Sequence, residues 1–486
     1  MLDLLKTAFL PNFPRTLFGS AKSGAADRLE SQRSAIEDKG LLELGSLFGR
    51  FLPQEKIFAK PATGAGSKER IFTPQVTFWA FLHQVLTRGM PCRDAVRKVQ
   101  GLCAERKREI PDDSTSAFCQ ARSRLDTDRH LLAHSHLVGH LDSRASAAEL
   151  WCGRSVKVID GTGVSMPDTE ANQGRWPQNA SQKPGCGFPA AKIVGCFSLE
   201  HGGLLAWTLT DQFHHESKVW REMWGLFGSG DVALTDRGFC SYGAIAQLKA
   251  RGVDSVMRLH QARKVDFRRG KRLGDGDRIQ VWERPQHQNK HIMSAQQWAQ
   301  LPEQLEVRTI RLLLQVSGFR TSSIVIVTTL LDAARYPASA LCELYFRRWN
   351  VELHFRDIKV SLGLDVLRCK TPDMVAKEIN MHAIAYNTIR AVMQAAASSH
   401  HQSLSRMSFK GTTDTVREWA PLFSARKSKR KKERLYAEMI SIVASDKVPQ
   451  RPMRSEPRAK KRRPKIYQLM TSPRGEMAVS PSRKLK

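Results

Sequence analysis

Long apolar runs are absent from this chain of 486 residues. No stretch approaches the ~18 consecutive apolar residues that a helix needs to cross a membrane. The first residues, Met1 to Pro14, also lack a basic start and a sustained apolar core, because Asp3 and Lys6 interrupt them. We therefore expect a soluble protein that has no signal peptide and no membrane partner.

Closely spaced cysteines are missing as well. The chain has nine cysteines, and no two of them form a Cys-x-x-Cys pair. Disulfide-stapled domains and structural zinc sites need cysteines at short, regular spacings, so the pattern argues against both. We expect these thiols to be reduced and mostly packed.

Acidic residues are scarce relative to basic ones. The chain has 77 Lys and Arg against 47 Asp and Glu, a net charge of +30, while its apolar fraction of 41% is ordinary for a folding chain. This excess disfavours an ordinary metabolic enzyme and favours a polyanionic partner, because Lys and Arg that neutralise phosphates release bound counterions. Nucleic acid is the first candidate.

The positive charge is concentrated towards the carboxyl end. Residues 426–486 contain 20 basic and 5 acidic residues, which is +15 and half of the total. They also contain six prolines and few large apolar residues after Val448. Such a segment cannot bury enough surface to offset the entropy of ordering. We expect a flexible basic tail that attracts DNA in a salt-sensitive way.

The apolar period changes along the rest of the chain. The first part has a helical pattern, in which Thr73 caps a helix that opens at Pro74. A short helix that follows is expected to expose Arg122 and Arg124. From Val156 onwards, β-branched runs alternate with helical stretches, which indicates an α/β core.

Two aspartates lie where an expected strand runs into a turn. Asp160 follows the β-branched run that ends at Ile159, and Asp236 follows the apolar run that ends at Thr235. In α/β sheets, ligands bind in the crevice at the carboxyl ends of the strands, so a carboxylate there is placed as in a site. The alternative is that each Asp, close to a glycine, serves only the turn.

Four polar residues share one stripe of a helix expected from Pro337 to about Leu362. They are Tyr345, Arg348, Glu352 and Lys359. At ~100° per residue they fall within about 60° of one another along ~21 Å. An adjacent face carries apolar residues that would bury the helix, namely Leu344, Val351, Phe355, Ile358 and Leu362. The alternative is a solvated face with Arg348 and Glu352 as an ordinary i,i+4 pair.

The helical stripe resembles a known signature. Tyr345-x2-Arg348-x3-Glu352-x6-Lys359 is similar, in residue type and spacing, to the Y-R-E-K signature of the DDE transposases encoded by bacterial insertion sequences. The segments Ile-Asp-Gly-Thr around Asp160 and Asp-Arg-Gly-Phe from Asp236 resemble those that carry the first two catalytic aspartates of that family. The resemblance extends over residues 72–474.

This resemblance implies an enzyme that cuts and pastes its own DNA element through hairpin ends. The catalytic and metal-binding residues would be Asp160, Asp236 and Glu352, which would hold two Mg²⁺ ions, with Mn²⁺ as a substitute. Three carboxylates so close repel one another, so we expect a metal-dependent site that is loosely ordered when empty. Tyr345, Arg348 and Lys359 would bind the phosphates of the element end.

The resemblance also implies the fold class and the partners. We expect an α/β protein with a ribonuclease-H-like catalytic core and a β-rich insertion, preceded by a helical DNA-binding region and followed by the tail. The segments are 1–145 (helical), 146–264 (core, first part), 265–330 (insertion), 331–425 (core completion) and 426–486 (tail). Expected partners are double-stranded DNA, of the element ends and the target, and a second copy of the chain in a synaptic complex. The expected location is the bacterial cytoplasm, at the nucleoid.

Several alternatives stay open at this level. His214, His215 and Glu216 form a rival metal cluster, but adjacent histidines point apart and no third spaced ligand follows, which favours a local polar cluster. Trp282 or Trp349 could receive a base displaced during hairpin formation, but packing in the core or at the surface explains each of them equally well, and neither is assigned this role. A DNA-binding derivative without catalysis and a structure-specific nuclease on the same fold are the competing functions.

Overall fold

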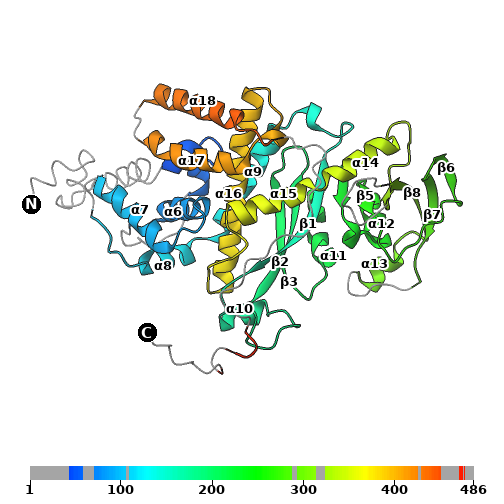
Figure 1. Cartoon of the computed structure of the whole chain (residues 1–486), viewed down its shortest axis with the longest axis horizontal. Coiled ribbons are helices and arrows are strands. Elements are labelled where there is room, and N and C mark those ends of the chain that lie inside the picture. The colour runs from blue at the N-terminus through cyan, green and yellow to red at the C-terminus, as the bar shows by residue number, and fades with distance from the viewer. Residues whose placement is uncertain are drawn as a thin grey trace, which may run out of the picture. The chain divides into compact units, whose positions relative to one another are not determined.

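The computed structural model of the chain is drawn in Figure 1. It describes residues 43–58, 71–105, 109–286, 293–313, 323–424, 428–449, 470–473 and 476. These residues form a mixed α/β structure. Within these ranges, no helix combines the length and apolar character needed to cross a bilayer.

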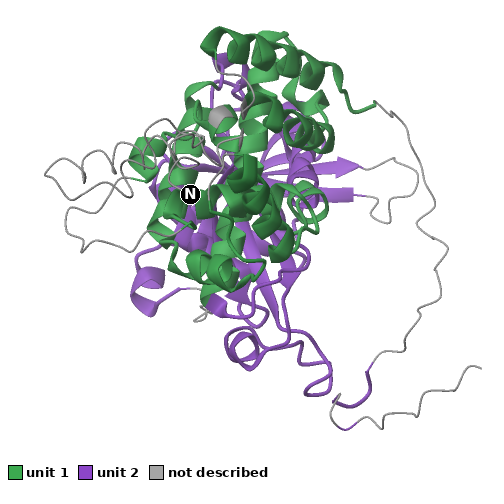
Figure 2. Cartoon of the chain, turned by 90° about the vertical axis from the view of Figure 1, so that its left-hand side faces the viewer, with its two compact units in different colours: residues 1–144, 357–364, 373–449 green, residues 145–356, 365–372, 450–486 purple. Residues whose placement is uncertain are grey.

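The chain divides into two compact units (Figure 2). The helical unit comprises residues 1–144, 357–364 and 373–449, and the sheet unit comprises residues 145–356, 365–372 and 450–486. This division differs from the expected segments. The helices that follow residue 373 group with the amino-terminal helices, whereas they were expected to complete the core.

The helical unit is built from three separate stretches of sequence. The first stretch forms α4 (Glu43–Phe48), α5 (Gln54–Ile57), α6 (Pro74–Leu86), α7 (Cys92–Glu105), α8 (Ser116–Arg124) and α9 (Thr127–Ser143). The two later stretches add the π-helical turn η4 (Asp357–Ser361), α16 (Pro372–Ser399), η5 (Leu404–Arg406), α17 (Phe409–Ser424) and α18 (Lys429–Ser445). Helix α6 begins as predicted, because the Thr73 side chain accepts a hydrogen bond from the Val76 amide at 3.2 Å.

One prediction about the helical unit is wrong. Arg124 is exposed, but Arg122 is buried, with 6% of its surface accessible. Its guanidinium lies over the Phe81 ring at 4.1 Å and close to the Phe118 ring. The apolar stem and flat head of an arginine can pack in this way against aromatic rings of a neighbouring helix.

Helix α18 lies in the segment that was expected to be a flexible tail. Its residues Met439, Ile440, Val443 and Ala444 are buried, so this part of the segment has an apolar face that packs. The average composition of residues 426–486 does not indicate these apolar residues, because basic residues and prolines dominate the segment. The basic cluster of residues 458–465 lies outside the described residues. A truncation at Ala425 would remove a packed helix as well as charge.

The nine described strands form one sheet. They are β1 (Val156–Ser165), β2 (Ala190–Ser198), β3 (Leu204–Asp211), β4 (Val232–Thr235), β5 (Asp254–Arg258), β6 (Lys271–Gly274), β7 (Asp277–Glu283), β8 (Gln304–Leu313) and β9 (Ser323–Thr328). Their order in the sheet is β3-β2-β1-β4-β5-β9-β8-β7-β6. Strands β1, β4 and β5 are parallel, and the other neighbours are antiparallel. The expected β-rich insertion therefore extends the same sheet beyond β5.

Short helices and the divided helix of the expected stripe complete the sheet unit. They are η1 (Ala147–Glu149), α10 (Glu170–Arg175), α11 (Glu216–Val219), η2 (Trp220–Leu226), η3 (Arg237–Phe239), α12 (Tyr242–Ala250), α13 (Ala295–Ala299), α14 (Ala338–Arg347) and α15 (Asn350–Arg356). A core that includes Ile159, Val194, Trp220, Ala233 and Ile245 lies between the sheet and these helices. It provides a rigid support for side chains at the carboxyl end of β4.

The cysteines are less packed than expected. All nine lie in the described ranges, and none of them forms a disulfide there. Four are buried, but Cys92, Cys186 and Cys342 are half-buried, and Cys119 and Cys152 are exposed. Five of the nine thiols are therefore open at least in part to solvent.

Candidate active site

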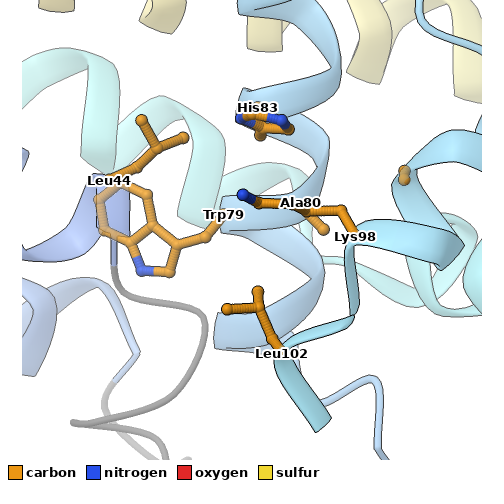
Figure 3. A pocket seen from close by; sticks show the side chains of 7 residues that line it. Leu44, Trp79, Ala80, His83, Lys98 and Leu102 are labelled. Atoms are coloured by element: carbon orange, nitrogen blue, oxygen red, sulfur yellow. The ribbon is translucent and has the colours of Figure 1, made fainter. Parts of the chain in front are cut away.

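A small cavity lies in the helical unit (Figure 3). Its lining comprises Leu44, Trp79, Ala80, His83, Ala95, Lys98 and Leu102. A volume of about 20 Å³ holds a single water at most. Burial lowers the pKa of His83 to about 4, so this imidazole is neutral near pH 7. The cavity has neither the size nor the charge for DNA chemistry.

The two predicted aspartates lie on adjacent strands of the sheet unit. Strands β1 and β4 pair in parallel, and the last partners in their register are Ile159 and Thr235. Asp160 and Asp236 are the next residues on the two strands. They therefore lie side by side where β4 ends.

The position of Asp160 differs from its prediction in one respect. Strand β1 does not end there, because its pairing with β2 continues as far as Ser165. Asp160 is thus a mid-strand residue, and Gly161 belongs to the strand as well. The turn that the Asp-Gly pair indicated does not form. Asp236, in contrast, directly follows β4 as predicted.

The helix that carries the expected stripe is interrupted. α14 ends at Arg347, α15 begins at Asn350, and the backbone becomes π-helical from Asp357. The single stripe calculated for a regular helix is therefore broken at Arg348 and again at Asp357. The apolar face is confirmed, because all five of its predicted residues are buried.

Arg348 connects the helix to the aspartates. Its side chain is 8% exposed, and its Nη1 donates a hydrogen bond to Asp160 Oδ2 at 3.2 Å. Its Nη2 lies 3.6 Å from Glu352 Oε1. The i,i+4 pair that was the alternative explanation does form, but it is part of a larger group, since one guanidinium serves carboxylates from a strand and a helix. In this arrangement Arg348 is engaged and turned away from solvent.

Tyr345 connects the same helix to the second aspartate. Its hydroxyl lies 3.4 Å from Asp236 Oδ1, to which it can donate a weak hydrogen bond. Burial raises the pKa of Tyr345 to about 12, and the charge of Asp236 adds to this effect while Arg348 opposes it. The phenol therefore keeps its proton and remains a donor.

The electrostatics of Asp160 report how close the carboxylates are. Burial raises its pKa to about 6, and the negative charges of Asp236 and Glu352 act in the same direction. The Gly161 amide, which donates to Asp160 Oδ1 at 2.8 Å, and the Arg348 guanidinium oppose them. Three carboxylates thus interact around one guanidinium, with an excess of negative charge.

The rival histidine cluster separates in the structure. His214 Nδ1 lies 2.8 Å from the Asp211 carboxylate, and His215 Nδ1 accepts from the Ser217 amide at the start of α11. Each imidazole thus has a hydrogen-bond partner nearby in the sequence, as expected for a local polar cluster. Glu216 takes another direction and lies against Gly161.

The contact between Glu216 and Gly161 was not predicted. A Cβ on Gly161 would meet the Glu216 carboxylate, with Cδ at 2.6 Å. A fourth carboxylate therefore lies against the residue that follows Asp160 on β1. Nothing in the spacing of the residues indicates this contact, and the glycine directly after Asp160 is the local hint. Among the described residues, the Glu216 carboxylate has no hydrogen-bond or ion-pair partner.

The two tryptophans considered for a displaced base differ in exposure. Trp282 is 6% exposed and belongs to the core of the sheet unit, and the Arg263 guanidinium covers its ring at 4.0 Å. Trp349 is 44% exposed, in the break between α14 and α15. Trp349 is thus partly exposed, whereas Trp282 is covered.

The remaining residue of the expected stripe, Lys359, belongs to the helical unit. It lies in the π-helical turn η4 and is half-buried. The structure therefore brings five of the six predicted site residues together in the sheet unit: Asp160, Asp236, Tyr345, Arg348 and Glu352. Lys359 is not among them.

The donor set suits a hard divalent cation. Mg²⁺ and Mn²⁺ prefer carboxylate oxygens, and Asp160, Asp236 and Glu352 supply these with a surplus of negative charge. Over the described ranges, however, no three His, Cys, Asp or Glu side chains converge closely enough to hold one ion. Arg348 lies between Asp160 and Glu352. The carboxylates would have to exchange this guanidinium for a cation.

Known proteins resemble the chain in sequence. Residues 151–388 match the family described as Transposase DDE domain, and all six predicted site residues lie in that range. The transposase InsG for insertion sequence element IS4 from Escherichia coli (strain K12) is 24% identical over 420 residues, which are 85% of this chain and 90% of that protein. A cryo-EM structure of the piggyBac transposase synaptic complex with hairpin DNA covers 86% of this chain and 84% of its own, with a TM-score of 0.41 and 10% identity. The family match and the IS4 relative show that the chain belongs to the DDE transposases of insertion sequences, a family of enzymes.

Proposed function

We propose that this chain binds the ends of its insertion sequence and catalyses metal-dependent strand cleavage and strand transfer there. The observation that supports it best is the group of Asp160, Asp236 and Glu352 around Arg348. A surplus of carboxylate at the end of a rigid strand is what phosphodiester chemistry with divalent cations requires. An ordinary surface ion pair needs no such surplus.

The three carboxylates are the proposed metal ligands, for two Mg²⁺ ions or for Mn²⁺ in their place. When bound, such ions activate the attacking oxygen of an in-line displacement and stabilise the leaving oxygen. Asp160 and Asp236 would hold their oxygens fixed, because both project from the paired β1 and β4. Glu352, whose side chain is 56% exposed, would complete the set from α15 and can move.

Tyr345, Arg348 and Lys359 are the proposed contacts to the DNA backbone. Arg348 would exchange its carboxylates for a phosphate as the cations bind, which keeps its guanidinium paired throughout. Tyr345 would hold Asp236 in place through its hydroxyl and then donate to a neighbouring phosphate. Lys359 would bind a phosphate as a point charge.

We also propose a ribonuclease-H-like core, DNA-binding helices and a hairpin pathway. The strand order β3-β2-β1-β4-β5, with the first three antiparallel and the last two parallel to β1, supports a ribonuclease-H-like core. The amino-terminal helices would bind DNA. Cleavage would proceed through hairpin ends.

The proposed partners are double-stranded DNA, both element ends and target, and a second copy of the chain in a synaptic complex. The proposed location is the bacterial cytoplasm, at the nucleoid. The net charge of +30 supports a DNA partner, because it predicts long-range attraction to phosphates that weakens as salt rises.

The decisive experiment measures nicking and joining of duplexes that carry the element ends, taken from the DNA that flanks the gene. Asp160→Asn, Asp236→Asn and Glu352→Gln should each lower the rate of Mg²⁺-dependent nicking by about 10³-fold or more, because several kcal/mol of transition-state stabilisation are lost. End binding, measured by fluorescence anisotropy in Ca²⁺, should change little.

The matched control is Glu343→Gln, which removes an exposed carboxylate from the same helical segment. It should leave nicking and binding unchanged. Full nicking by a folded Glu352→Gln protein would overturn the assignment. Nicking without joining would indicate a nuclease, and tight binding without nicking in Mg²⁺ or Mn²⁺ would indicate an inactive derivative.

A further inference from the structure

A cysteine begins helix α7 in the helical unit. Cys92 is the first residue of this helix of 14 residues, where backbone N–H groups without helical partners favour an anion. Its Sγ accepts hydrogen bonds from Arg122 Nη1 at 3.1 Å and from Gln84 Nε2 at 3.6 Å. A guanidinium and an amide, from α8 and α6, thus both stabilise a thiolate at Cys92.

A second thiol adjoins the first. Cys119, which is exposed on α8, lies three residues before Arg122 and on the same side of that helix, and the Arg122 guanidinium reaches the Cys92 sulfur. The interaction with Cys119 lowers the pKa of Cys92 to about 5, with burial opposing it and Arg122 and Gln84 assisting. The same contact raises the pKa of Cys119, because a thiol beside a thiolate resists losing its own proton. The two cysteines therefore divide into a thiolate at Cys92 and a thiol at Cys119.

The position of Arg122 supports this pairing. A buried cation is costly unless an anion faces it, and Arg122 is 6% exposed with its Nη1 on the Cys92 sulfur. An arginine that served DNA phosphates would have its guanidinium at the surface, as Arg124 does on the same helix. The buried guanidinium is instead suited to hold a thiolate.

We propose that Cys92 and Cys119 form an oxidation-sensitive dithiol site, in which a hydroperoxide oxidises Cys92 and Cys119 converts the product to a disulfide. A hydroperoxide can reach both sulfurs, because Cys119 is exposed and Cys92 is half-buried. The site is separate from the carboxylates of the sheet unit, and it does not depend on the proposed DNA chemistry.

The reaction balances with one equivalent of peroxide. The Cys92 thiolate attacks one oxygen of H₂O₂, an S–O bond forms, the O–O bond breaks, and the departing hydroxide takes a proton to become water. Cys119 then attacks the sulfenic sulfur. The S–S bond forms, the S–O bond breaks, and the leaving hydroxide accepts the Cys119 proton. Two thiols lose two electrons, and the peroxide becomes two waters.

The test uses the reduced full-length protein and hydrogen peroxide at pH 7. After blocking with N-ethylmaleimide, non-reducing peptide mapping should find the Cys92 and Cys119 peptides cross-linked, and dithiothreitol should separate them. In Cys119→Ser no cross-link should form, and dimedone should trap a sulfenic acid at Cys92. Cys152→Ser, which removes the other exposed thiol, is the matched control and should cross-link as the unchanged protein does.

A second measurement does not rely on oxidation. Iodoacetamide at pH 6 should label Cys92 about 10-fold faster than Cys152, since a larger thiolate fraction outweighs its lower intrinsic nucleophilicity. Equal labelling of the two thiols would overturn the proposal. So would peroxide treatment that leaves Cys92 reduced, or that carries it to the sulfonic acid with no cross-linked peptide.

Discussion

Among the buried arginines of the described residues, one in each unit faces an anion at a site considered above. Arg348 of the sheet unit is 7% exposed, and Arg122 of the helical unit is 6% exposed. Arg348 faces Asp160 and Glu352. Arg122 faces the single sulfur of Cys92. The residue type and the burial are the same, but the numbers of opposing charges differ.

This difference separates a site that needs a partner from one that is complete. The negative charge of Asp236 also raises the pKa of Asp160. Three carboxylates therefore surround one guanidinium, and binding a further cation there would still lower the free energy. One thiolate facing one guanidinium is balanced, and an added ion would gain little there. The charges at Cys92 and Arg122 become unequal only if the thiolate is protonated or oxidised. A charge surplus therefore marks the binding site better than a buried arginine does.

The largest effect should come from removing each arginine in turn. Arg122→Met should destabilise the helical unit by about 3 kcal/mol, because it breaks a buried pair and loses packing against aromatic rings. Arg348→Met should destabilise the sheet unit by a similar amount, because it leaves Asp160 and Glu352 without their counter-charge, and saturating Mg²⁺ should restore this loss because a cation can replace the guanidinium. Hydrogen exchange followed separately in α7 and β1 measures the two units. Equal losses that Mg²⁺ leaves unchanged would remove the distinction.

The cation alone should stabilise the sheet unit and leave the helical unit as it was. At 100 times its dissociation constant, Mg²⁺ or Mn²⁺ should add about 2.7 kcal/mol, visible as slower exchange in β1 and α15 and a raised melting temperature. Glu352→Gln should lose most of this gain, while Glu343→Gln should keep it. A gain of the same size in α7 would mean that the ion binds elsewhere.

Gly161→Ala should test the fourth carboxylate with a smaller effect. The new Cβ would meet the Glu216 carboxylate at 2.6 Å, but a flexible side chain can turn away, so stability should change by less than about 1 kcal/mol. Nicking should fall about tenfold, or ~1.4 kcal/mol, if the displaced Glu216 supports Asp160. Gly163→Ala is the control, because its Cβ would meet no described atom closer than 4.0 Å. The double variant Gly161→Ala/Glu216→Gln should nick DNA no more slowly than Gly161→Ala alone.

The strands and the order of the site residues could be predicted because they depend on local patterns. β-branched runs located β1, β4 and β5, and Asp236 follows β4 as expected. Asp160 was placed at a strand end because Gly161 indicates a turn by itself, whereas pairing with β2, which local sequence does not encode, carries β1 past it.

The remaining features depend on contacts between distant segments. Arg122 was expected at the surface because its charge was considered alone, and its partner Cys92 lies thirty residues away. The break at Arg348 likewise has no local signal such as proline or glycine. Such features arise when tertiary partners outweigh local propensity.

A pH dependence distinguishes the thiolate from a neutral thiol at Cys92. The pKa of Cys92 is lowered from 9.0 to about 5, so between these pH values the unfolded chain binds more protons than the folded one, and stability rises with pH. The stability that Cys92 contributes is present above pH 9 and is lost as pH falls through 5. The difference in melting temperature between the unchanged protein and Cys92→Ser, which cancels all other titrations, should therefore shrink by a few degrees from pH 8 to pH 5. A difference that stays constant over this range would mean that Arg122 faces a neutral thiol, and the comparison of two arginine–anion sites would then lose its second member.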